Sequence, residues 1–507
     1  MIEKANLTRH QDRFVTLGAV AQRLNAEFSG NSEIIISDVT HDSRQAQANG
    51  LFAAIRGLAS DGHRFIPDVM RRGAAGVISE LEKPADFSGG WLQVENARIA
   101  LARAANLIHG EPSKKLKLVG VTGTNGKTTT TYLINALATA AGQKGAMLTT
   151  VEYRIGEKSE PAVRTTPEAS DTERFLASAV EQNCTFAVME ASSQALDLHR
   201  CDALLFAVAV FTNLTRDHLD YHGTMENYFA AKKKLFDGRT GEKPGASIIN
   251  LDDVWGKQLA AELKADGQRI ITYSLNADNA DLTAKNIEIS LVRGTSFELN
   301  TPDGNVNVVS PLVGRPHVYN ILAATAATLE IGCELTEIKK GIEVCTGAPG
   351  RFERVAQSGD FAVVVDYAHT DDALLNVLKT AKNLTDKRVI TVFGAGGDRD
   401  RSKRQPMGEI AGRYSDFVVL TSDNPRTEDP LQIIEQIKTG LCETATQFVV
   451  IPDRREAIYR AIAEAQSGDV VLIAGKGHET YQIIGDDKFH FDDREAARSA
   501  LESRLEN

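Results

Sequence analysis

The stretch of the chain most able to do chemistry is Gly-Val-Thr-Gly-Thr-Asn-Gly-Lys-Thr-Thr, residues 120–129. Its glycines leave backbone N–H groups free to point at an anion, Lys127 adds a positive charge, and the Thr128 hydroxyl can ligate Mg²⁺. The usual spacing, G-x-x-x-x-G-K-[ST], would place the first glycine at position 121, where this chain has Val121. The stretch lies between a strand-like run and a helical pattern, which predicts an ATP-binding loop; the alternative is a glycine-rich turn that binds nothing.

Side chains able to hold a magnesium ion follow two further strand-like runs. Glu190 ends the run 186–190, and His218 lies in the polar segment after the run 206–211. Both should reach the sheet edge that carries the phosphate loop, because parallel strands end at one edge. His218 and His222 are four residues apart and could instead suggest zinc, although no cysteine or His-Glu-x-x-His pattern accompanies them. A third interpretation has His218 only capping or hydrogen-bonding its loop.

Four buried-strand patterns in the last third of the chain each run directly into a polar cluster. The strand-like runs are 361–365, 389–393, 417–420 and 470–473, and the clusters are 366–369, 394–399, 421–426 and 475–479. Any one cluster could be a mere connection, since loops are polar by default. Four clusters at the carboxyl edge of one parallel sheet predict a binding face.

The elements that must position these residues predict an α/β protein of three domains. Residues 1–95 mix the strand-like runs 51–56, 76–79 and 90–94 with a helical pattern around 65–72. Residues 96–346 alternate strands and helices as a parallel sheet does. Within the second domain, residues 282–313 carry two hairpin signals that suggest a β appendage. Residues 347–507 repeat the alternation as a Rossmann-like domain. We therefore predict a small domain, a P-loop-type ATPase domain and a Rossmann-like domain.

Composition narrows the function classes. The 507 residues include 57 Lys and Arg against 68 Asp and Glu, and the net charge of −11 argues against bulk affinity for nucleic acid or anionic membranes. No apolar run approaches a membrane span, and the first residues lack a signal-peptide core, so we expect a cytoplasmic protein. The five cysteines are scattered and never in C-x-x-C spacing, which indicates neither a disulfide framework nor a thiolate zinc site.

Five separated motifs, in order, resemble the successive signatures of the Mur ligase family. They are Gly123-Thr124-Asn125-Gly126-Lys127-Thr128, Glu190-Ala191-Ser192-Ser193, Asn213-Leu214 with Asp217-His218-Leu219-Asp220, His317 with Asn320, and Asp366-Tyr367-Ala368-His369. Members of the family are ATP-dependent amide-forming enzymes of peptidoglycan synthesis. The resemblance spans nearly the whole chain. Residues 42–44 and 51–52 are similar to the UDP-binding domain of members that add the third amino acid, to UDP-N-acetylmuramoyl-L-alanyl-D-glutamate.

The resemblance implies a reaction and a set of catalytic residues. The γ-phosphate of ATP passes to the D-glutamyl side-chain carboxylate, and an amine then displaces phosphate from the acyl phosphate. Two anions must meet, so cations are needed. The resemblance implies Lys127, Glu190, His218 and Lys232 as catalytic residues, with Thr128, Glu190, His218 and Lys232 holding Mg²⁺. It also implies that Lys232 is carbamylated to N6-carboxylysine, whereas the bare sequence would make residues 232–234 a solvated basic face.

The resemblance further implies three sets of ligand-binding residues. The ATP set is Gly123, Thr124, Asn125, Gly126, Lys127, Thr128, Thr129, His317, Asn320, Arg351 and Asp366. The UDP-muramoyl-dipeptide set is His41, Ser43, Thr165, Thr166, Ser192, Leu198 and Arg200. The set for the incoming amino acid is Arg399, Asp423, Asn424, Pro425, Arg426, Gly475 and Glu479.

Arg426 indicates which amino acid is added. The run Asp423-Asn424-Pro425-Arg426 resembles the signature of members that add meso-diaminopimelate. That amino acid carries one carboxylate more than lysine, and a guanidinium binds a carboxylate through two parallel hydrogen bonds. The alternative makes Arg426 a surface ion-pair partner of Glu428 or Asp429.

Other functions remain open at this point. They are the same step with L-lysine, another Mur-type ligase, a relative of folylpolyglutamate synthase, and a non-catalytic nucleotide-dependent glycan sensor. A binder without catalysis would have no need of all the transfer groups. The expected partners are ATP, UDP-N-acetylmuramoyl-L-alanyl-D-glutamate and meso-diaminopimelate, with Mg²⁺ as cofactor and the protein a monomer.

Overall fold

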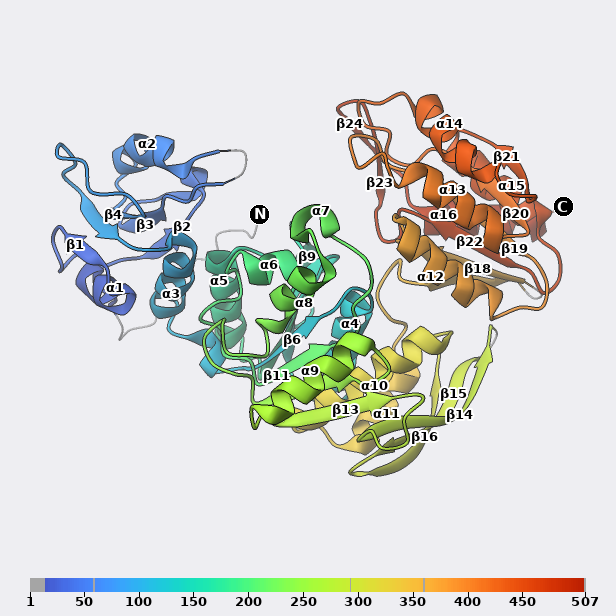
Figure 1. The fold of residues 1–507 in the computed structure, drawn as a ribbon, viewed down its shortest axis with the longest axis horizontal. Coiled ribbons are helices and arrows are strands. Elements are labelled where there is room, and N and C mark those ends of the chain that lie inside the picture. The colour runs from blue at the N-terminus through green and yellow to red at the C-terminus, as the bar shows by residue number, and fades with distance from the viewer. Residues whose placement is uncertain (1–13, 58–59, 292, 359–360, 506–507) are drawn as a thin grey trace. The chain divides into compact units, whose positions relative to one another are not determined.

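The computed structural model describes residues 14–57, 60–291, 293–358 and 361–505 (Figure 1). The first residues, which we expect to lack a signal-peptide core, lie outside this part of the chain. The chain divides into two compact units, the first made of Met1–Thr283, Asn300–Gly304 and Ile321–Gly341, and the second of Ala284–Leu299, Asn305–Asn320 and Ile342–Asn507. The fold is mixed α/β, as the sequence predicts.

A five-stranded sheet of order β1-β5-β4-β3-β2 forms near the N-terminus. Its strands are β1 (Glu27–Ser29), β2 (Asp38–Thr40), β3 (Gly50–Ala53), β4 (Gly76–Ser79) and β5 (Gly90–Gln93), and its helices are α1 (Leu17–Leu24), α2 (Ile66–Arg71) and α3 (Ala97–Ile108). Strands β3, β4 and β5 and helix α2 match predicted elements. Helix α1 was not predicted from the sequence; it begins after the Thr16 cap and ends at Asn25, which is in the left-handed conformation.

Helix α3 links the first domain to the next. The predicted boundary at residue 95 assigns this helix to the central domain. Its residues Ala100, Leu101 and Ala104 nevertheless belong to the apolar core that includes β3, β4 and β5. The same helix reaches α5 (Ala169–Glu181), where Asn106 Nδ2 donates to Glu173 Oε1 at 2.9 Å. The boundary stays a prediction, and α3 packs on both sides of it.

The central sheet has eleven strands in the order β16-β15-β14-β13-β12-β11-β6-β10-β7-β8-β9. The strands are β6 (Lys117–Thr122), β7 (Gly145–Leu148), β8 (Glu152–Ile155), β9 (Lys158–Pro161), β10 (Phe186–Glu190), β11 (Val208–Phe211), β12 (Ala246–Asn250), β13 (Ile270–Ser274), β14 (Leu282–Ser290), β15 (Gly294–Thr301) and β16 (Gly304–Ser310). Strands β7, β10, β6, β11, β12 and β13 run parallel. The predicted β appendage is present as β14 to β16, and it continues the central sheet because β14 pairs with β13.

Helices connect these strands and place the phosphate loop. They are α4 (Lys127–Ala140), α5, α6 (Ser193–Asp197), α7 (Leu219–His222), α8 (Met225–Lys233), α9 (Val254–Ala265), α10 (Arg315–Glu330) and α11 (Leu335–Val344). Strand β6 lies between β10 and β11, so the loops after these three strands are neighbours. This order brings the loop at residues 123–126 beside the segments that follow Glu190 and Phe211.

The C-terminal sheet has the order β17-β18-β22-β19-β20-β21. Its strands are β17 (Glu353–Ser358), β18 (Phe361–Asp366), β19 (Val389–Phe393), β20 (Phe417–Leu420), β21 (Gln447–Val450) and β22 (Val470–Ala474), all parallel except β17. The four predicted strands are β18, β19, β20 and β22. Beyond β22, β23 (Tyr481–Ile484) and β24 (Asp487–His490) form a hairpin.

Helices cover both faces of this sheet, as a doubly wound parallel sheet requires. Along β19, Val389 and Phe393 join the core of α12 (Asp371–Lys382), α13 (Arg404–Tyr414) and α14 (Pro430–Leu441). Ile390 and Val392 join the opposite core, with α15 (Arg454–Glu464) and α16 (Asp493–Leu505). Within the described ranges no helix is both long and apolar enough to span a membrane.

Candidate active site

The phosphate loop requires glycine for steric reasons. Gly123 has φ of +147°, and a Cβ on it would lie 1.9 Å from Thr212 Oγ1. Gly126 caps α4 in the left-handed conformation, with φ of 86°, so that the helix begins at Lys127. The N-terminus of a helix favours negative charge. The loop therefore has the backbone of a phosphate cradle despite its unusual glycine spacing.

Hydrogen bonds hold the loop against the segment after β11. Thr124 N donates to the Asn213 carbonyl at 2.8 Å, and Asn125 N donates to Asn213 Oδ1 at 2.9 Å. Thr212 Oγ1 donates to the Asn125 carbonyl at 2.6 Å. The predicted ATP residues and the Asn213 motif are thus one hydrogen-bonded unit.

Two lysines converge on this loop. Lys127 Nζ donates to the carbonyls of Gly123 and Thr124 at 3.0 and 2.8 Å, and Lys232 Nζ donates to the same Gly123 carbonyl at 2.7 Å. Lys232 is buried, and burial, reinforced by the nearby charge of Lys127, holds the pKa of its amine well below the usual value. The bare-sequence interpretation of Lys232 as part of a solvated face is wrong, because it ignores the packing of α8.

The next two residues differ from Lys232. Lys233 and Lys234 form ion pairs with Glu262 at 2.6 Å and Asp197 at 2.7 Å. Their side chains keep partial exposure, so they behave as surface charges. Only Lys232 of this basic run faces the phosphate loop.

Glu190 and His218 lie on opposite sides of β6. The Glu190 carboxylate is buried and accepts from Thr150 N at 2.8 Å and from Thr150 Oγ1 at 3.2 Å. His218 has a left-handed backbone and a half-exposed side chain, with Nε2 3.5 Å from Asp217 Oδ2. Burial lowers the pKa of His218, the charge of Asp217 opposes this shift, and the charge of Lys127 adds to it, so that the pKa lies below its usual value.

The metal alternatives can be compared on these contacts. His222 is engaged elsewhere, since its Nε2 lies 3.0 Å from Ser193 Oγ. Across the described part of the chain, no three His, Cys, Asp or Glu side chains group together as metal ligands. A carboxylate, a buried Thr128 hydroxyl and oxygen atoms of a phosphate suit Mg²⁺. The donor set fits Mg²⁺ by type.

The residues expected to bind the muramoyl dipeptide are linked to Glu190. Thr166 Oγ1 donates to the Glu190 carbonyl at 2.8 Å and to Ser192 Oγ at 3.2 Å. Thr165 Oγ1 accepts from Thr150 Oγ1 at 3.1 Å, and Arg200 Nη1 donates to the Thr166 carbonyl at 3.3 Å. The structure therefore brings Thr165, Thr166, Ser192 and Arg200 together.

A glutamate that the sequence analysis missed organises the arginines here. Glu168 is buried and forms ion pairs with Arg164 and Arg200, both at 2.8 Å, and with Arg98 at 3.7 Å. The charges of Glu168 and Arg164 act on His41, whose buried Nδ1 has no hydrogen-bond partner among the described residues. No local motif marks Glu168, because two of its three arginines, Arg98 and Arg200, are distant in sequence.

Two further residues of this set have structural positions. Ser43 begins a 3₁₀ turn, Ser43–Gln45, capped by Asp42, and its carbonyl accepts from Arg72 Nη1 at 3.1 Å. Leu198 caps the C-terminus of α6.

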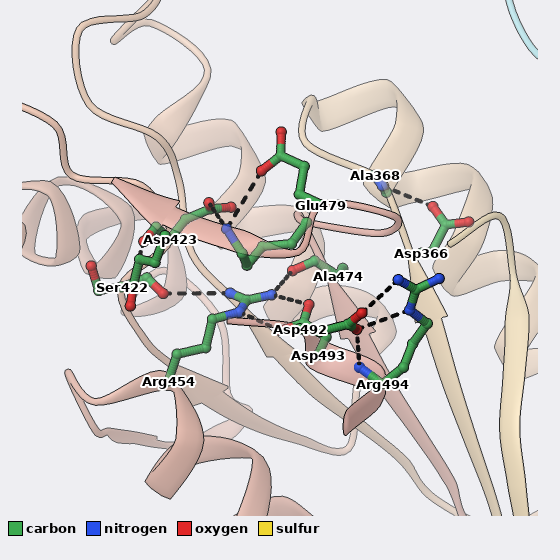
Figure 2. Close-up of polar contacts among 12 residues, drawn as sticks. Asp366, Ala368, Ser422, Asp423, Arg454, Ala474, Glu479, Asp492, Asp493 and Arg494 are labelled. Carbon is green, nitrogen blue, oxygen red and sulfur yellow. Dashed lines mark hydrogen bonds and ion pairs between the residues drawn. The ribbon is translucent and has the colours of Figure 1, made fainter. Parts of the chain in front are cut away.

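The remaining ATP residues lie in the second unit. His317 and Asn320 are one turn apart on α10, and burial lowers the pKa of His317 to about 4. Asp366 accepts from Phe352 N at 2.7 Å and Ala368 N at 2.8 Å, the second contact being drawn in Figure 2. The Arg351 guanidinium lies over the Tyr367 ring, 4.8 Å from its centroid.

Two loops expected to bind the incoming amino acid do come together. Asn424, after β20, donates from Nδ2 to Glu479 Oε2 at 2.9 Å, although Glu479 follows β22. Burial raises the pKa of Glu479. Gly475 is also close, since a Cβ on it would lie 2.6 Å from Asp423 Oδ2.

Lys476 joins these side chains and was not assigned a role from the sequence. It is fully buried, and its Nζ lies 3.1 Å from Asn424 Oδ1, 3.4 Å from Glu479 Oε2 and 3.8 Å from Asp423 Oδ1. A buried ammonium needs such partners. Its position between two glycines at a strand end was the signal that could have identified it.

Arg426 is held in a strained backbone conformation. Its φ is 51°, its N–H donates to the Ile483 carbonyl at 3.1 Å, and its carbonyl accepts from Gly485 N at 2.8 Å. Arg426 Nη1 donates to the Gly397 carbonyl at 2.7 Å. The structure does not support the ion pair of Arg426 with Glu428, which instead pairs with other arginines.

Arg399 and Pro425 complete the predicted set. Arg399 is exposed in the loop after β19, and a Cβ on Gly396 would lie 3.9 Å from its Cγ and 3.0 Å from Arg426 Nη1. The Pro425 carbonyl would lie 1.9 Å from a Cβ on Gly397. Glycine at 396 and 397 thus lets the loops after β19 and β20 approach closely.

Models of a known family match three parts of the chain. The Mur ligase family catalytic domain matches residues 35–123, the Mur ligase middle domain residues 121–328, and the Mur ligase glutamate ligase domain residues 350–477. Together with the relatives described next, these matches define the class of protein. The chain belongs to the Mur ligase family.

Particular relatives share most of their length with it. A UDP-N-acetylmuramoyl-L-alanyl-D-glutamate–2,6-diaminopimelate ligase of Solibacter usitatus is 47% identical over 92% of this chain and 93% of that protein. The enzyme of the same name from Geobacter sulfurreducens is 47% identical over 91% and 94%. A solved structure of a ligase with this name superposes with a TM-score of 0.71 at 35% identity, covering 97% of this chain and 100% of the other.

Proposed function

We propose that this protein is the ATP-dependent ligase that adds meso-2,6-diaminopimelate to UDP-N-acetylmuramoyl-L-alanyl-D-glutamate. The observation that carries the choice of amino acid is the joining of two loops, in which Arg426 supplies a guanidinium and Glu479 a carboxylate. The relatives named for this reaction support it along nearly the whole chain.

The phosphate loop binds ATP in this proposal. Backbone N–H groups of residues 123–129 and the ammonium of Lys127 hold the phosphates. When ATP binds, Lys127 turns from the loop carbonyls that it contacts in this structure to the phosphate oxygens. His317, Asn320, Arg351 and Asp366 bind other parts of the nucleotide. The γ-phosphate passes to an oxygen of the D-glutamyl side-chain carboxylate, and ADP leaves.

Thr128, Glu190, His218 and a carbamylated Lys232 would hold magnesium. When bound, the metal would neutralise negative charge on the phosphates. Lys232 suits carbamylation because its buried amine lies beside the loop and its lowered pKa favours the neutral form that reacts with CO₂. The amine nitrogen attacks CO₂ and loses one proton, so that a neutral side chain becomes an anionic carbamate.

The dipeptide substrate is held by the group around Glu190 and Glu168. Thr165, Thr166, Ser192 and Arg200 face one another there, and Arg200 offers a cation to the substrate's carboxylates. In this proposal His41 and Ser43 bind near the uridine, and Leu198 contacts the dipeptide substrate together with these residues. The amine of the incoming amino acid then attacks the acyl phosphate carbon, the new amide forms, and inorganic phosphate leaves.

The amino-acid site discriminates by charge. Arg426 and Arg399 bind the two carboxylates, while Glu479 and the Gly475 carbonyl accept from an ammonium. Asp423, Asn424 and Pro425 shape the loop. Lysine would leave one guanidinium without a carboxylate partner, and the loss of a hydrogen bond to a charged group costs about 1.5–3 kcal/mol.

A turnover assay tests the proposal. The purified protein is incubated with ATP, Mg²⁺ and UDP-N-acetylmuramoyl-L-alanyl-D-glutamate, and then with meso-diaminopimelate or L-lysine in separate reactions. We expect phosphate release and a product one diaminopimelyl residue heavier. Equal turnover with lysine would overturn the choice of amino acid, and no turnover with either would favour a nucleotide-dependent glycan sensor.

We further propose that the reaction takes place in the cytoplasm and that the protein acts as a monomer, without a nucleic acid or membrane partner. The net charge of −11 supports the absence of a polyanionic partner. Light scattering on the purified protein measures its mass, and a value near twice 55.0 kDa would refute the monomer.

A further inference from the structure

Two buried arginines flank the loop that carries Arg426. Arg404 and Arg454 are among the largest fully buried side chains of the described chain, and each is the first residue of a helix, α13 and α15. A positive charge at a helix N-terminus is unfavourable, because that end of the helix carries partial positive charge. Burying a charge adds a further cost. Such placements need compensating contacts, and both arginines have them.

Arg454 ties together the strand ends that lead into the two substrate loops. Its Nη2 donates to the carbonyl of Ala474, the last residue of β22, at 3.0 Å, and its Nη1 donates to the Ser422 carbonyl at 3.4 Å. Figure 2 shows Arg454 between these two residues and Asp493. Ser422 directly precedes Asp423, and Ala474 directly precedes Gly475. One guanidinium therefore fixes the starting points of both loops.

The counter-ion of Arg454 fixes the guanidinium itself. Asp493, the first residue of α16, accepts from Nε and Nη2 of Arg454, each at 2.7 Å, and both side chains are fully buried. This bidentate geometry leaves the planar fork a single orientation. A carboxylate also suits the N-terminus of α16.

Arg404 fixes the other end of the same loop. It binds both carboxylate oxygens of Glu428, at 3.0 and 2.9 Å, and its Nη2 donates to the Gly396 carbonyl at 3.2 Å. Glu428 Oε1 also accepts from Asp398 N at 2.6 Å. The loop after β19 and the loop after β20 are thereby joined just beyond Arg426.

The strained backbone of Arg426 explains why such fixing is needed. A left-handed backbone costs about 1–2 kcal/mol for a residue other than glycine, and it persists only where surrounding contacts determine it. Between the fixed points at Ser422 and Glu428, the loop has little freedom to relax. The Arg426 guanidinium is therefore already oriented before a ligand arrives.

We propose that Arg404 and Arg454 are positioning residues that set the preference for meso-diaminopimelate over lysine by fixing the loop from Asp423 to Glu428. This inference rests on the proposed function. Neither arginine needs to touch the substrate. Their effect is transmitted through backbone carbonyls and Glu428 to the orientation of Arg426.

The test replaces each arginine by lysine, which keeps the charge but loses the bidentate fork. Initial rates of the R404K and R454K variants are measured with meso-diaminopimelate and with L-lysine. Each variant should raise the KM for meso-diaminopimelate about tenfold, as expected for the loss of one or two hydrogen bonds. The KM for ATP should stay within about twofold, and the preference for meso-diaminopimelate over lysine should fall.

Arg388 provides the matched control. It binds the Asp469 carboxylate at 2.7 Å and the Glu464 carbonyl at 2.9 Å, next to the opposite, amino ends of β19 and β22. R388K makes the same chemical change in the same sheet, far along the strands from the substrate loops. It should lower thermal stability without changing the KM for meso-diaminopimelate or the preference.

The outcomes separate the two proposals. If the wild-type protein fails to turn over meso-diaminopimelate, the proposed function fails before any variant is compared. If the wild type is active and R404K and R454K keep its KM and its preference, the positioning role is overturned. If R454K does not fold, the KM for meso-diaminopimelate and the preference over lysine in R404K and E428Q test the positioning role at the other end of the loop. An equal rise of every KM, in R388K as well, would also overturn it.

Discussion

Replacing Arg426 by asparagine probes the choice of amino acid most directly. Arg426 has a φ of 51°, a left-handed conformation that asparagine tolerates better than most residues. The R426N variant therefore removes the guanidinium with little added backbone strain. Within the protein it removes the hydrogen bond from Nη1 to the Gly397 carbonyl. Any further loss of activity in R426N therefore reports the missing contact between the guanidinium and the amino-acid substrate.

The expected magnitude follows from the contact that is lost. A guanidinium that binds a carboxylate makes charge-assisted hydrogen bonds, which contribute about 1.5–3 kcal/mol. That range corresponds to a fall of roughly 10- to 150-fold in kcat/KM for meso-diaminopimelate. L-Lysine has no second carboxylate, so its kcat/KM should change by less than about threefold.

The assay measures initial rates of phosphate release over a range of each amino acid at saturating ATP and dipeptide substrate. R413A is the control, because Arg413 is an exposed residue of the same domain that forms an ion pair with its helix neighbour Glu409. Equal losses for both amino acids would mean that Arg426 only supports its loop. An unchanged preference would refute the argument that Arg426 binds the extra carboxylate.

Three further predictions follow from individual contacts. K232A should lose activity and regain part of it with added short carboxylates, measured by phosphate release; full activity without them would refute the carbamate. G123A should unfold at lower temperature and fail to bind ATP in calorimetry, because the added Cβ would lie 1.9 Å from Thr212 Oγ1. The control is G142A, which should bind ATP normally, because a Cβ at Gly142 would meet no other part of the protein within 4 Å. Contacts with Arg404 lower the pKa of Glu428 from 4.5 to about 2, so the stability that Glu428 contributes is present above pH 4.5 and is lost as the pH falls toward 2. In denaturant titrations, the difference in free energy of unfolding between wild type and E428Q should shrink over this pH range. A difference that stays constant would contradict the lowered pKa.

The sequence predicted those strands whose signal is local. Runs such as Val-Ile-Thr-Val-Phe in β19 are apolar and β-branched throughout, and they pack on both faces, so composition alone identified them. It missed β1 and β2, which have three residues each and are partly buried, and β21, where burial is incomplete. Such short edge strands depend on their neighbours for pairing. The packing of α3 against the first sheet could not be predicted from the sequence either, because it too depends on contacts with elements distant in sequence.

The candidate site divides in the same way. Glu190 could be placed from sequence because it ends a buried strand, and strand ends meet at one edge. Lys476, Glu168 and Arg454 could not, since each is a buried charged residue with at least one ion-pair partner distant in sequence. Residue type predicts exposure for all three. These side chains can be buried because the tertiary structure brings residues of opposite charge next to them.

The balance of charge in the amino-acid site supplies an argument that does not depend on Arg426 alone. Asp423 and Glu479 face Lys476, and Arg426 and Arg399 lie on the adjoining loops, so the residues expected to bind the amino acid, together with Lys476, comprise two acidic and three basic side chains. meso-Diaminopimelate carries two ammonium and two carboxylate groups at neutral pH and has no net charge, whereas lysine has a net charge of about +1. A site with a surplus positive charge repels the second more than the first. Raising the salt concentration should therefore narrow the preference, because screening weakens the repulsion more than it weakens a direct bidentate contact.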